Sequence, residues 1–325
     1  MERIPVKKVN SDVAAIAVAD MHLSLNRPIA RGEPNWADYQ ESVLKQLAAL
    51  QDKYECPILI AGDVFDRWDT TAACINHALI HWPCKAYGTY GVPGNHDLPH
   101  HVYTEIHRSA YWTLVEAGKL RNLTPPFAQQ IESSAGTITV TPFPCSFPIK
   151  PNPAKKDLVL RIALIHDLIW TEKTGYPGAD ESKRYGKWIN KLTGFDVAIF
   201  GDNHKGFLIQ SDDKCSILNV GTLMCRKATE MDYKPSVGLI HINGKVSRHY
   251  LNISKDKWAD KAHEIAKIEQ TLQVDLDGFV KELTAARQVG SEWSSKMVDV
   301  YCKQNKVPNS VKQIMMTMVE GELKK

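Results

Sequence analysis

Five short polar clusters, rich in Asp, His and Asn, each follow an apolar run of the sequence. Carboxylate, imidazole and amide oxygen ligands together suit divalent Mn, Fe or Zn. A carboxylate shared by two ions about 3.5–4 Å apart belongs to the arrangement that stabilises both the attacking and the leaving oxygen of phosphoryl transfer. The clusters therefore predict a binuclear metal site. They are Asp20-Met21-His22, Gly62-Asp63-Val64-Phe65-Asp66-Arg67, Gly94-Asn95-His96-Asp97, His166-Asp167 and Gly201-Asp202-Asn203-His204.

The apolar runs before these clusters have the length and composition of short buried strands. In open α/β sheets, ligands bind beyond the carboxyl ends of the strands, so the clusters converge if the strands are neighbours. A single Asp-x-His after a strand is usually only a turn, and the prediction depends on the agreement of all the clusters. The expected strands are Val13–Ala19, Pro57–Ala61, Ala86–Val92, Val159–Ile165 and Val197–Phe200.

Helices and further strands separate these runs. Helical periodicity predicts helices over Trp36–Gln51, Thr70–Trp82 and Thr104–Ala117. Strands are expected over Thr137–Thr141 and Ile217–Val220, and over a hairpin of Val237–Ile242 and Val246–Tyr250 joined by Asn243-Gly244. Early βαβ units followed by short hairpin strands predict an α/β sandwich.

The sequence changes character after about residue 250, where strand signals end. Three apolar stripes at helical spacing lie near 276–283, 293–301 and 311–318. We therefore expect two regions, residues 1–250 with the chemistry and residues 251–325 as a short helical C-terminal region. The C-terminal helices either dock on a partner protein or pack on the rest of the chain.

Composition excludes several classes of protein. Lys and Arg number 40 and Asp and Glu 37 in 325 residues, so the chain does not bind nucleic acid by bulk charge alone. No apolar run is long enough to span a bilayer, and the N-terminus lacks the apolar core of a signal peptide. The seven Cys show no CxxC spacing, which favours a reduced cytoplasmic chain over a zinc ribbon.

The order and spacing of the five clusters resemble the calcineurin-like metallophosphoesterase superfamily, over roughly residues 13–250. The resemblance implies a sandwich of two mixed β-sheets flanked by helices. It also implies two divalent metal ions and a hydroxide that bridges them and attacks phosphorus. By the resemblance, the first metal is held by Asp20, His22, Asp63 and His204, and the second by Asp63, Asn95, His166 and Asp202.

The resemblance also assigns residues around the metals. His96 corresponds to the histidine that protonates the leaving oxygen, with Asp97 orienting its imidazole. Asp66 and Arg67 are expected to support the metal site by hydrogen bonds. The last motif usually reads Gly-His-x-His, and here Asp202 stands in place of the first His. A carboxylate adds negative charge, so we expect Mn²⁺, with Mg²⁺ or Fe²⁺ as alternatives, rather than Zn²⁺.

Within the superfamily, Gly62–Asp66 and the stretch Asn219–Ile242 are similar to the SbcD-type DNA repair nucleases. This similarity implies a DNA exonuclease or endonuclease from a bacterium or bacteriophage, acting in the cytoplasm. It implies DNA and a coiled-coil ATPase similar to SbcC as partners, and a homodimer is a further option. Arg108, Lys205 and Arg226 are candidate DNA contacts. The alternatives are a small-molecule phosphodiesterase or phosphatase, and a catalytically weakened scaffolding phosphoesterase.

Overall fold

The computed structural model describes residues 11–83, 86–151, 159–175, 179–211 and 214–267. The named strands and helices all belong to one compact unit, made of Met1–Gly175 and Asp180–Ala259. The unit extends past residue 250 because the following segment stays hydrogen-bonded to it. The amide of Gly32 donates to the carbonyl of Lys257 (2.8 Å), and that of Ala259 donates to Ala30 (3.0 Å).

The three apolar stripes expected in the tail lie outside the described residues, so a C-terminal helical region and its docking on an ATPase stay predictions. Within the described part of the chain, no helix is long and apolar enough to cross a membrane.

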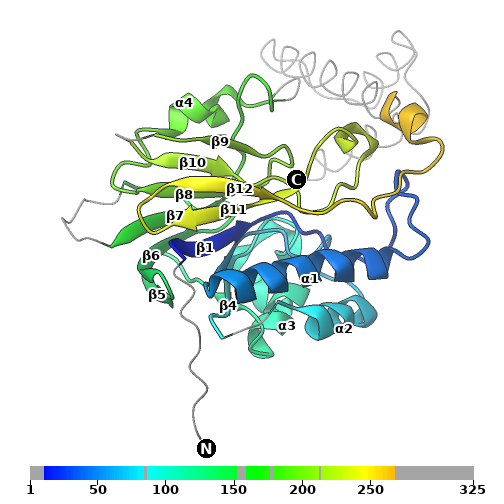
Figure 1. Cartoon of the computed structure of the whole chain (residues 1–325), viewed down its shortest axis with the longest axis horizontal. Coiled ribbons are helices and arrows are strands. Elements are labelled where there is room, and N and C mark those ends of the chain that lie inside the picture. The colour runs from blue at the N-terminus through cyan, green and yellow to red at the C-terminus, as the bar shows by residue number, and fades with distance from the viewer. Residues whose placement is uncertain (1–10, 84–85, 152–158, 176–178, 212–213, 268–325) are drawn as a thin grey trace, which may run out of the picture. The chain divides into compact units, whose positions relative to one another are not determined.

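Among the described residues, twelve strands form two mixed sheets of six, as the resemblance implied (Figure 1). The first sheet contains β1 (Val13–Val18), β2 (Ile58–Ala61), β3 (Thr89–Val92), β4 (Arg121–Asn122), β11 (Ser236–His241) and β12 (Val246–Tyr250). The second contains β5 (Gln129–Ser133), β6 (Gly136–Phe143), β7 (Leu160–His166), β8 (Val197–Gly201), β9 (Phe207–Ile209) and β10 (Ser216–Asn219).

The strand order places the chemically important strands side by side. The first sheet has the order β12-β11-β1-β2-β3-β4, in which β1 to β4 run parallel. The second has the order β5-β6-β7-β8-β10-β9, in which β7 and β8 are parallel neighbours. The strands that precede the polar clusters are therefore adjacent within each sheet.

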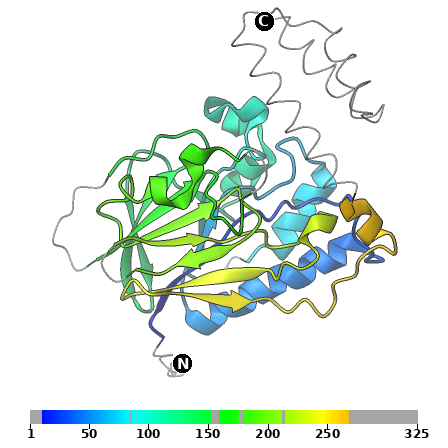
Figure 2. The ribbon, with the colours of Figure 1, turned by 90° about the horizontal axis from the view of Figure 1, so that it is seen from above.

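Helices cover the outer faces of the two sheets (Figure 1). Helices α1 (Trp36–Tyr54), α2 (Ala72–His81) and α3 (Ala110–Glu116) lie on the first sheet, and the short α4 (Tyr185–Trp188) lies on the second. Figure 2 shows the hairpin β11–β12 in yellow beside α1 in blue. Two bonds join α1 to the segment after β12, since Gln46 donates to the Asn252 carbonyl (3.2 Å) and accepts from the Asn252 amide (2.8 Å).

The alternation along β1 explains how the sheets pack. Ile16 and Val18 belong to the cluster beneath the helices, whereas Ala17 belongs to the cluster between the sheets. Small residues on the inner face let the sheets approach closely. A Cβ added at Gly238 in β11 would lie only 2.3 Å from Leu218 Cδ2 in β10.

Most elements expected from the sequence are confirmed, with boundary changes. The helix expected over Thr104–Ala117 is interrupted at Ser109, where the backbone is extended and the side chain caps α3 by accepting from the Trp112 amide (3.2 Å). The segment before it is a 3₁₀ helix, Tyr103–Arg108. Strands β4, β5 and β9 and helix α4 were missed, because they are short or largely polar.

The polar clusters meet at one edge of the sandwich, as the topology requires. Three of them follow β1, β2 and β3 of the first sheet, and two follow β7 and β8 of the second. Backbone pairing continues past the strand ends, since the Asp20 amide donates to Gly62 (3.1 Å) and the His22 amide to Asp63 (3.0 Å). Pairing beyond the strands fixes these two clusters relative to each other.

Candidate metal centre

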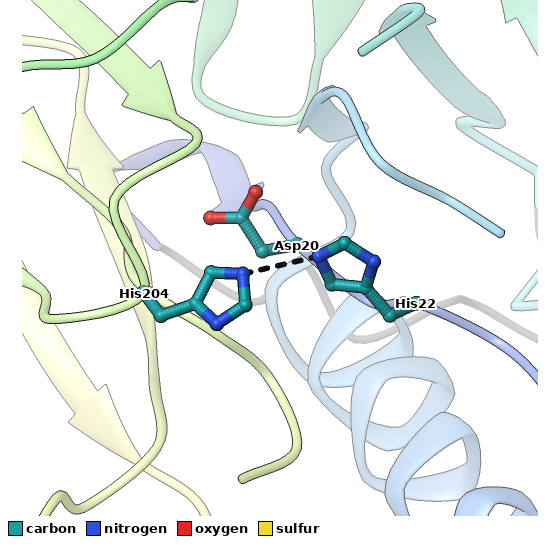
Figure 3. A group of neighbouring side chains, drawn as sticks. All are labelled: Asp20, His22 and His204. Carbon is teal, nitrogen blue, oxygen red and sulfur yellow. Dashed lines mark hydrogen bonds between the residues drawn. The ribbon is translucent and has the colours of Figure 1, made fainter. Parts of the chain in front are cut away.

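Asp20, His22 and His204 form one group of converging ligand atoms (Figure 3). Their donor atoms lie within 4.8 Å of one another, and the Nε2 atoms of the two histidines are 3.1 Å apart. Asp20 and His22 follow β1, whereas His204 follows β8 in the other sheet. This group contains three of the four residues expected to hold the first metal.

Asp63 lies between two such groups. Its Oδ2 is 3.6 Å from His22 Nε2, and its Oδ1 is 3.6 Å from His166 Nε2. Asp63 also shares a group with Asp20 and His166 whose ligand atoms lie within 4.8 Å. The two oxygens of one buried carboxylate therefore face two different sets of ligands, which is the placement that a bridging ligand needs.

His166 brings the remaining expected ligands together. Its Nδ1 donates to the Ala61 carbonyl (2.8 Å), so Nε2 is the atom that faces the centre. Asn95 Oδ1 lies 2.9 Å from this Nε2, and Asp202 Oδ1 lies 3.9 Å from it. The carboxylate of Asp202 thus lies near His166, another residue expected to hold the second metal.

The backbone at several of these positions is strained. Asp20, His22, Asp63 and Asp202 have φ values of 49°, 45°, 54° and 101°, in the region that favours glycine. Such residues cost of order 1–3 kcal/mol each and persist only where the surrounding structure holds them. Gly94 is required for a different reason, because a Cβ there would lie 2.0 Å from Asp63 Oδ1.

The electrostatics of the cluster fit bound cations. Burial, together with the neighbouring charge of Asp63, raises the pKa of the Asp20 carboxyl to about 7. Burial by itself would lower the pKa of His166, but the carboxylates of Asp63 and Asp20 raise it to about 9. The carboxylates of this buried cluster therefore stabilise positive charge beside them, in this structure as a proton on the His166 imidazole.

The surroundings of the two His22 nitrogens also fit a metal-binding site. His22 Nδ1 is buried and has no hydrogen-bond partner among the described residues, and the nearest partner of His22 Nε2 is the imidazole nitrogen of His204 at 3.1 Å. Burial and the charge of His204 hold the pKa of His22 well below its usual range, so its ring is neutral and offers a lone pair. The donor set of imidazole, carboxylate and amide oxygen fits two divalent ions.

Glu230 is a functional residue that the sequence analysis missed. It is buried, and its Oε1 accepts from Nδ1 of His204 at 2.8 Å. Its Oε2 accepts from the amides of Arg226 (2.7 Å) and Lys227 (3.0 Å). A carboxylate on the outer nitrogen of a ligating histidine fixes the ring and raises its basicity. Glu230 is 26 residues beyond His204, and no motif connects the two.

The expected role of Asp97 is wrong. Its carboxylate is fully buried and accepts from the amides of Gly94 (3.0 Å), Val64 (3.2 Å) and Phe65 (3.1 Å), so it ties the second cluster to the third. The imidazole of His96 is oriented instead by the carbonyl of Asp66, which lies 2.7 Å from Nδ1.

His96 lies beside the candidate centre, and its role as proton donor stays a prediction. The side chain is exposed, and its ring makes an edge-on contact with His22 at a centroid distance of 4.7 Å. The His96 amide donates to Asp63 Oδ1 (3.0 Å). The imidazole therefore stands beside the centre and open to solvent, which a proton donor to a substrate requires.

Of the two supporting residues, one is near the centre and the other is not. Asp66 Oδ1 lies 3.7 Å from His22 Nδ1, and Asp66 Oδ2 pairs with Arg226 at 2.8 Å. Arg67 points away, because its exposed guanidinium pairs with Asp69 at 2.9 Å. The expectation that Arg67 supports the metal site is therefore wrong.

The candidate DNA contacts differ in their burial and in their distance from the centre. Arg226 is mostly buried, and it donates to the His22 carbonyl (2.5 Å) in addition to pairing with Asp66, so it positions the centre. Arg108 is exposed and pairs with Glu105 at 2.7 Å. Lys205 is exposed and adjacent to His204. Arg108, Lys205 and Arg226 all stay predictions as DNA contacts.

Replacing Asp63 by Asn tests the shared carboxylate. Asp63→Asn removes the charge that faces both ligand groups, so Mn²⁺ affinity at both sites should fall by more than the about 10- to 100-fold that is typical of a supporting residue. Calorimetric Mn²⁺ titration measures this, with Asp69→Asn as the matched surface control. Two ions bound at wild-type affinity by a folded Asp63→Asn protein would contradict the assignment.

Glu230→Ala tests the support of His204. The variant leaves the imidazole free to rotate, so the affinity of one Mn²⁺ should fall about 10- to 100-fold while the other changes less. Glu230→Gln, which can still accept from Nδ1, should lose less, and the exposed Glu132→Gln is a matched control. An equal loss at both metals would show a general disturbance of the fold instead.

Comparison with known proteins agrees with this geometry. A family model described as calcineurin-like phosphoesterase matches residues 15–206, a segment that holds all the expected metal ligands and His96. The search of curated proteins found no match. Among solved structures, the chain is similar to a 5'-nucleotidase precursor from Thermus thermophilus, with 13% identity and a TM-score of 0.43, over 85% of this chain and 60% of that one.

The structural match is too distant to indicate a substrate, and this chain spans less than two thirds of the length of the 5'-nucleotidase precursor. The family match, by contrast, covers more than half of the chain, and its segment includes the strand ends that carry the ligand groups. The chain belongs to the calcineurin-like phosphoesterase family.

Proposed function

We propose that this chain is a binuclear-metal phosphodiesterase that hydrolyses DNA. The observation that carries the phosphoesterase part is the placement of Asp63 between two groups of ligand atoms. The DNA part is supported by the similarity of Gly62–Asp66 and Asn219–Ile242 to SbcD-type nucleases. The exposed position of His96 also supports it, because a polymer can reach a residue at an open surface.

In the proposed hydrolysis, some residues bind the metal ions and another donates a proton to the leaving oxygen. Two bound divalent ions supply Lewis-acid stabilisation of the phosphoryl charge and activation of water. Asp63 and the histidines around it would hold these ions through their carboxylate oxygens and imidazole nitrogens. The Nδ1–H of His96 is held by the Asp66 carbonyl at 2.7 Å, so Nε2 is the nitrogen that carries a proton to the leaving oxygen.

A small-molecule phosphodiesterase or phosphatase is the second candidate. The formal net charge of +3 over the whole chain favours it, since affinity for DNA comes largely from Lys and Arg contacts to phosphates. The basic side chain of Arg226, which lies near the centre, is also already paired with Asp66.

A substrate comparison separates the two candidates. Full-length protein loaded with Mn²⁺ should cleave labelled single- or double-stranded DNA at low salt, where phosphate contacts are strongest. Bis(p-nitrophenyl) phosphate, a cyclic nucleotide and a nucleoside 5'-monophosphate serve as parallel substrates. Asp63→Asn, purified in the same way, controls for contaminating nuclease. Brisk turnover of the small substrates with intact DNA would replace the proposal by the second candidate.

His96→Ala tests the proton donor. Hydrolysis of DNA should slow by about 10²- to 10⁴-fold, the usual worth of positioned acid catalysis. The loss should be much smaller for bis(p-nitrophenyl) phosphate, because nitrophenolate leaves without a proton. Mn²⁺ binding, followed by calorimetry, should be retained. If both substrates slow by the same factor, His96 does not act as the proton donor.

A further inference from the structure

A cavity of about 510 Å³ opens beside the candidate metal centre, on the side of His96. Its walls come from two loops, one at Asp66–Trp68 after β2 and one between Asn95 and His101 after β3. Its volume is within the range of about 300–1,000 Å³ that small-ligand sites occupy. None of the functions assigned so far uses this cavity.

The wall of the cavity carries aromatic rings rather than free charges. The half-buried indole of Trp68 lies beside the exposed imidazole of His100, with ring centroids 5.6 Å apart. The carbonyl of Trp68 accepts from the Ala110 amide (2.8 Å), which anchors its backbone to the start of α3. Flat aromatic faces of this kind bind nucleobases by stacking, with little preference for sequence.

The charges of the cavity wall are largely paired. Arg67 pairs with Asp69 at 2.9 Å, and the carboxylate of Asp66 pairs with Arg226 at 2.8 Å. Because Asp66 is neutralised in this way, the described wall presents no unpaired carboxylate to repel a phosphodiester. Imidazole and indole groups are left as the groups available to a ligand.

The position of His96 indicates which part of a substrate would lie in this cavity. His96 lines the cavity and also forms a group of converging atoms with His22 and Asp63. If His96 protonates the leaving oxygen, as proposed above, the group attached to that oxygen lies on the His96 side of phosphorus. The cavity is the space on that side.

We propose that this cavity binds the nucleobase of the nucleotide that carries the leaving oxygen, stacked on Trp68 beside His100. The proposal rests on the proposed function. In the reaction, the oxygen of water bonds to phosphorus and the P–O bond to this nucleotide breaks. The leaving oxygen takes the proton of His96, and the proton that water releases restores the one on His96. The reaction therefore needs no reactant besides water.

The test uses dinucleotides that carry an abasic tetrahydrofuran residue on one side or the other. The product that lacks phosphate identifies the leaving side directly. For the Mn²⁺-loaded full-length protein, removing the leaving-side base should lower kcat/KM by about 5- to 150-fold, the usual worth of base–aromatic stacking. Removing the other base should have a smaller effect.

Substitution of Trp68 should abolish this discrimination. In Trp68→Ala the ratio of kcat/KM between the normal and the leaving-side abasic dinucleotide should fall toward one, whereas Trp68→Phe should keep most of it. Trp112→Phe, which changes an indole outside the cavity, is the matched control. A ratio that stays at the wild-type value in Trp68→Ala would overturn the proposal and leave the phosphodiesterase function intact.

A binding measurement keeps the proposal testable without turnover. Quenching of 2-aminopurine deoxyriboside 5'-monophosphate fluorescence by the wild-type protein, absent in Trp68→Ala, would support the cavity as a base site even if no dinucleotide were cleaved. Equal quenching by both proteins, or none by the wild type, would overturn it. The failure of this inference is thus distinguishable from the failure of the proposed function.

Discussion

A buried carboxylate at the end of β2 is the group on which the rest of this structure depends. Asp63 is 2% exposed, and its two oxygens face His22 from one sheet and His166 from the other. A buried charge is stable only when it is paired. The sandwich meets this condition by bringing the carboxyl ends of both sheets to the same edge. The close approach of the sheets, with alanines on the inner face of β1, makes that meeting possible.

Backbone amides and outer carboxylates hold this edge in place. Asp97 ties the loop after β3 to the loop after β2 through three amide donors, and Glu230 fixes the outer nitrogen of His204. Arg226 joins Asp66 to the backbone of His22. These contacts offset the strain of the left-handed residues, because each restrains a turn that would otherwise relax. The groups that touch substrate can then stand on short, fixed turns.

Asp202 shows how the family's chemistry can be adjusted at one position. Its amide donates to the carboxylate of Asp20 (3.0 Å), which holds the strained turn, and its own carboxylate points to the side of His166. A carboxylate in place of imidazole adds negative charge to one half of the centre only. Harder ions such as Mn²⁺ or Mg²⁺ suit an oxygen-rich half better than Zn²⁺ does, and this preference stays a prediction.

The amino-acid sequence alone was enough to predict the fold class, the main elements and a resemblance to the family. Apolar runs followed by Asp, His and Asn identified β1, β2, β3, β7 and β8 and the ligands after them, because local composition and order carry this information. The resemblance to the family, rather than the spacing itself, singled out His96 as a residue beside the centre. Short or polar elements such as β5 and β9 left no such signal, since their stability comes from pairing with neighbours.

The contacts of each side chain near the centre could be assigned only from the three-dimensional structure. Asp97 and Arg67 stand in the motifs, yet one binds backbone amides and the other pairs at the surface. Glu230 stands outside every motif and reaches His204 across 26 residues. Sequence spacing fixes which loop a residue is on, but the direction of its side chain depends on turns and packing partners from other strands. The cavity beside His96 arises for the same reason, from two loops that the sheet order places together.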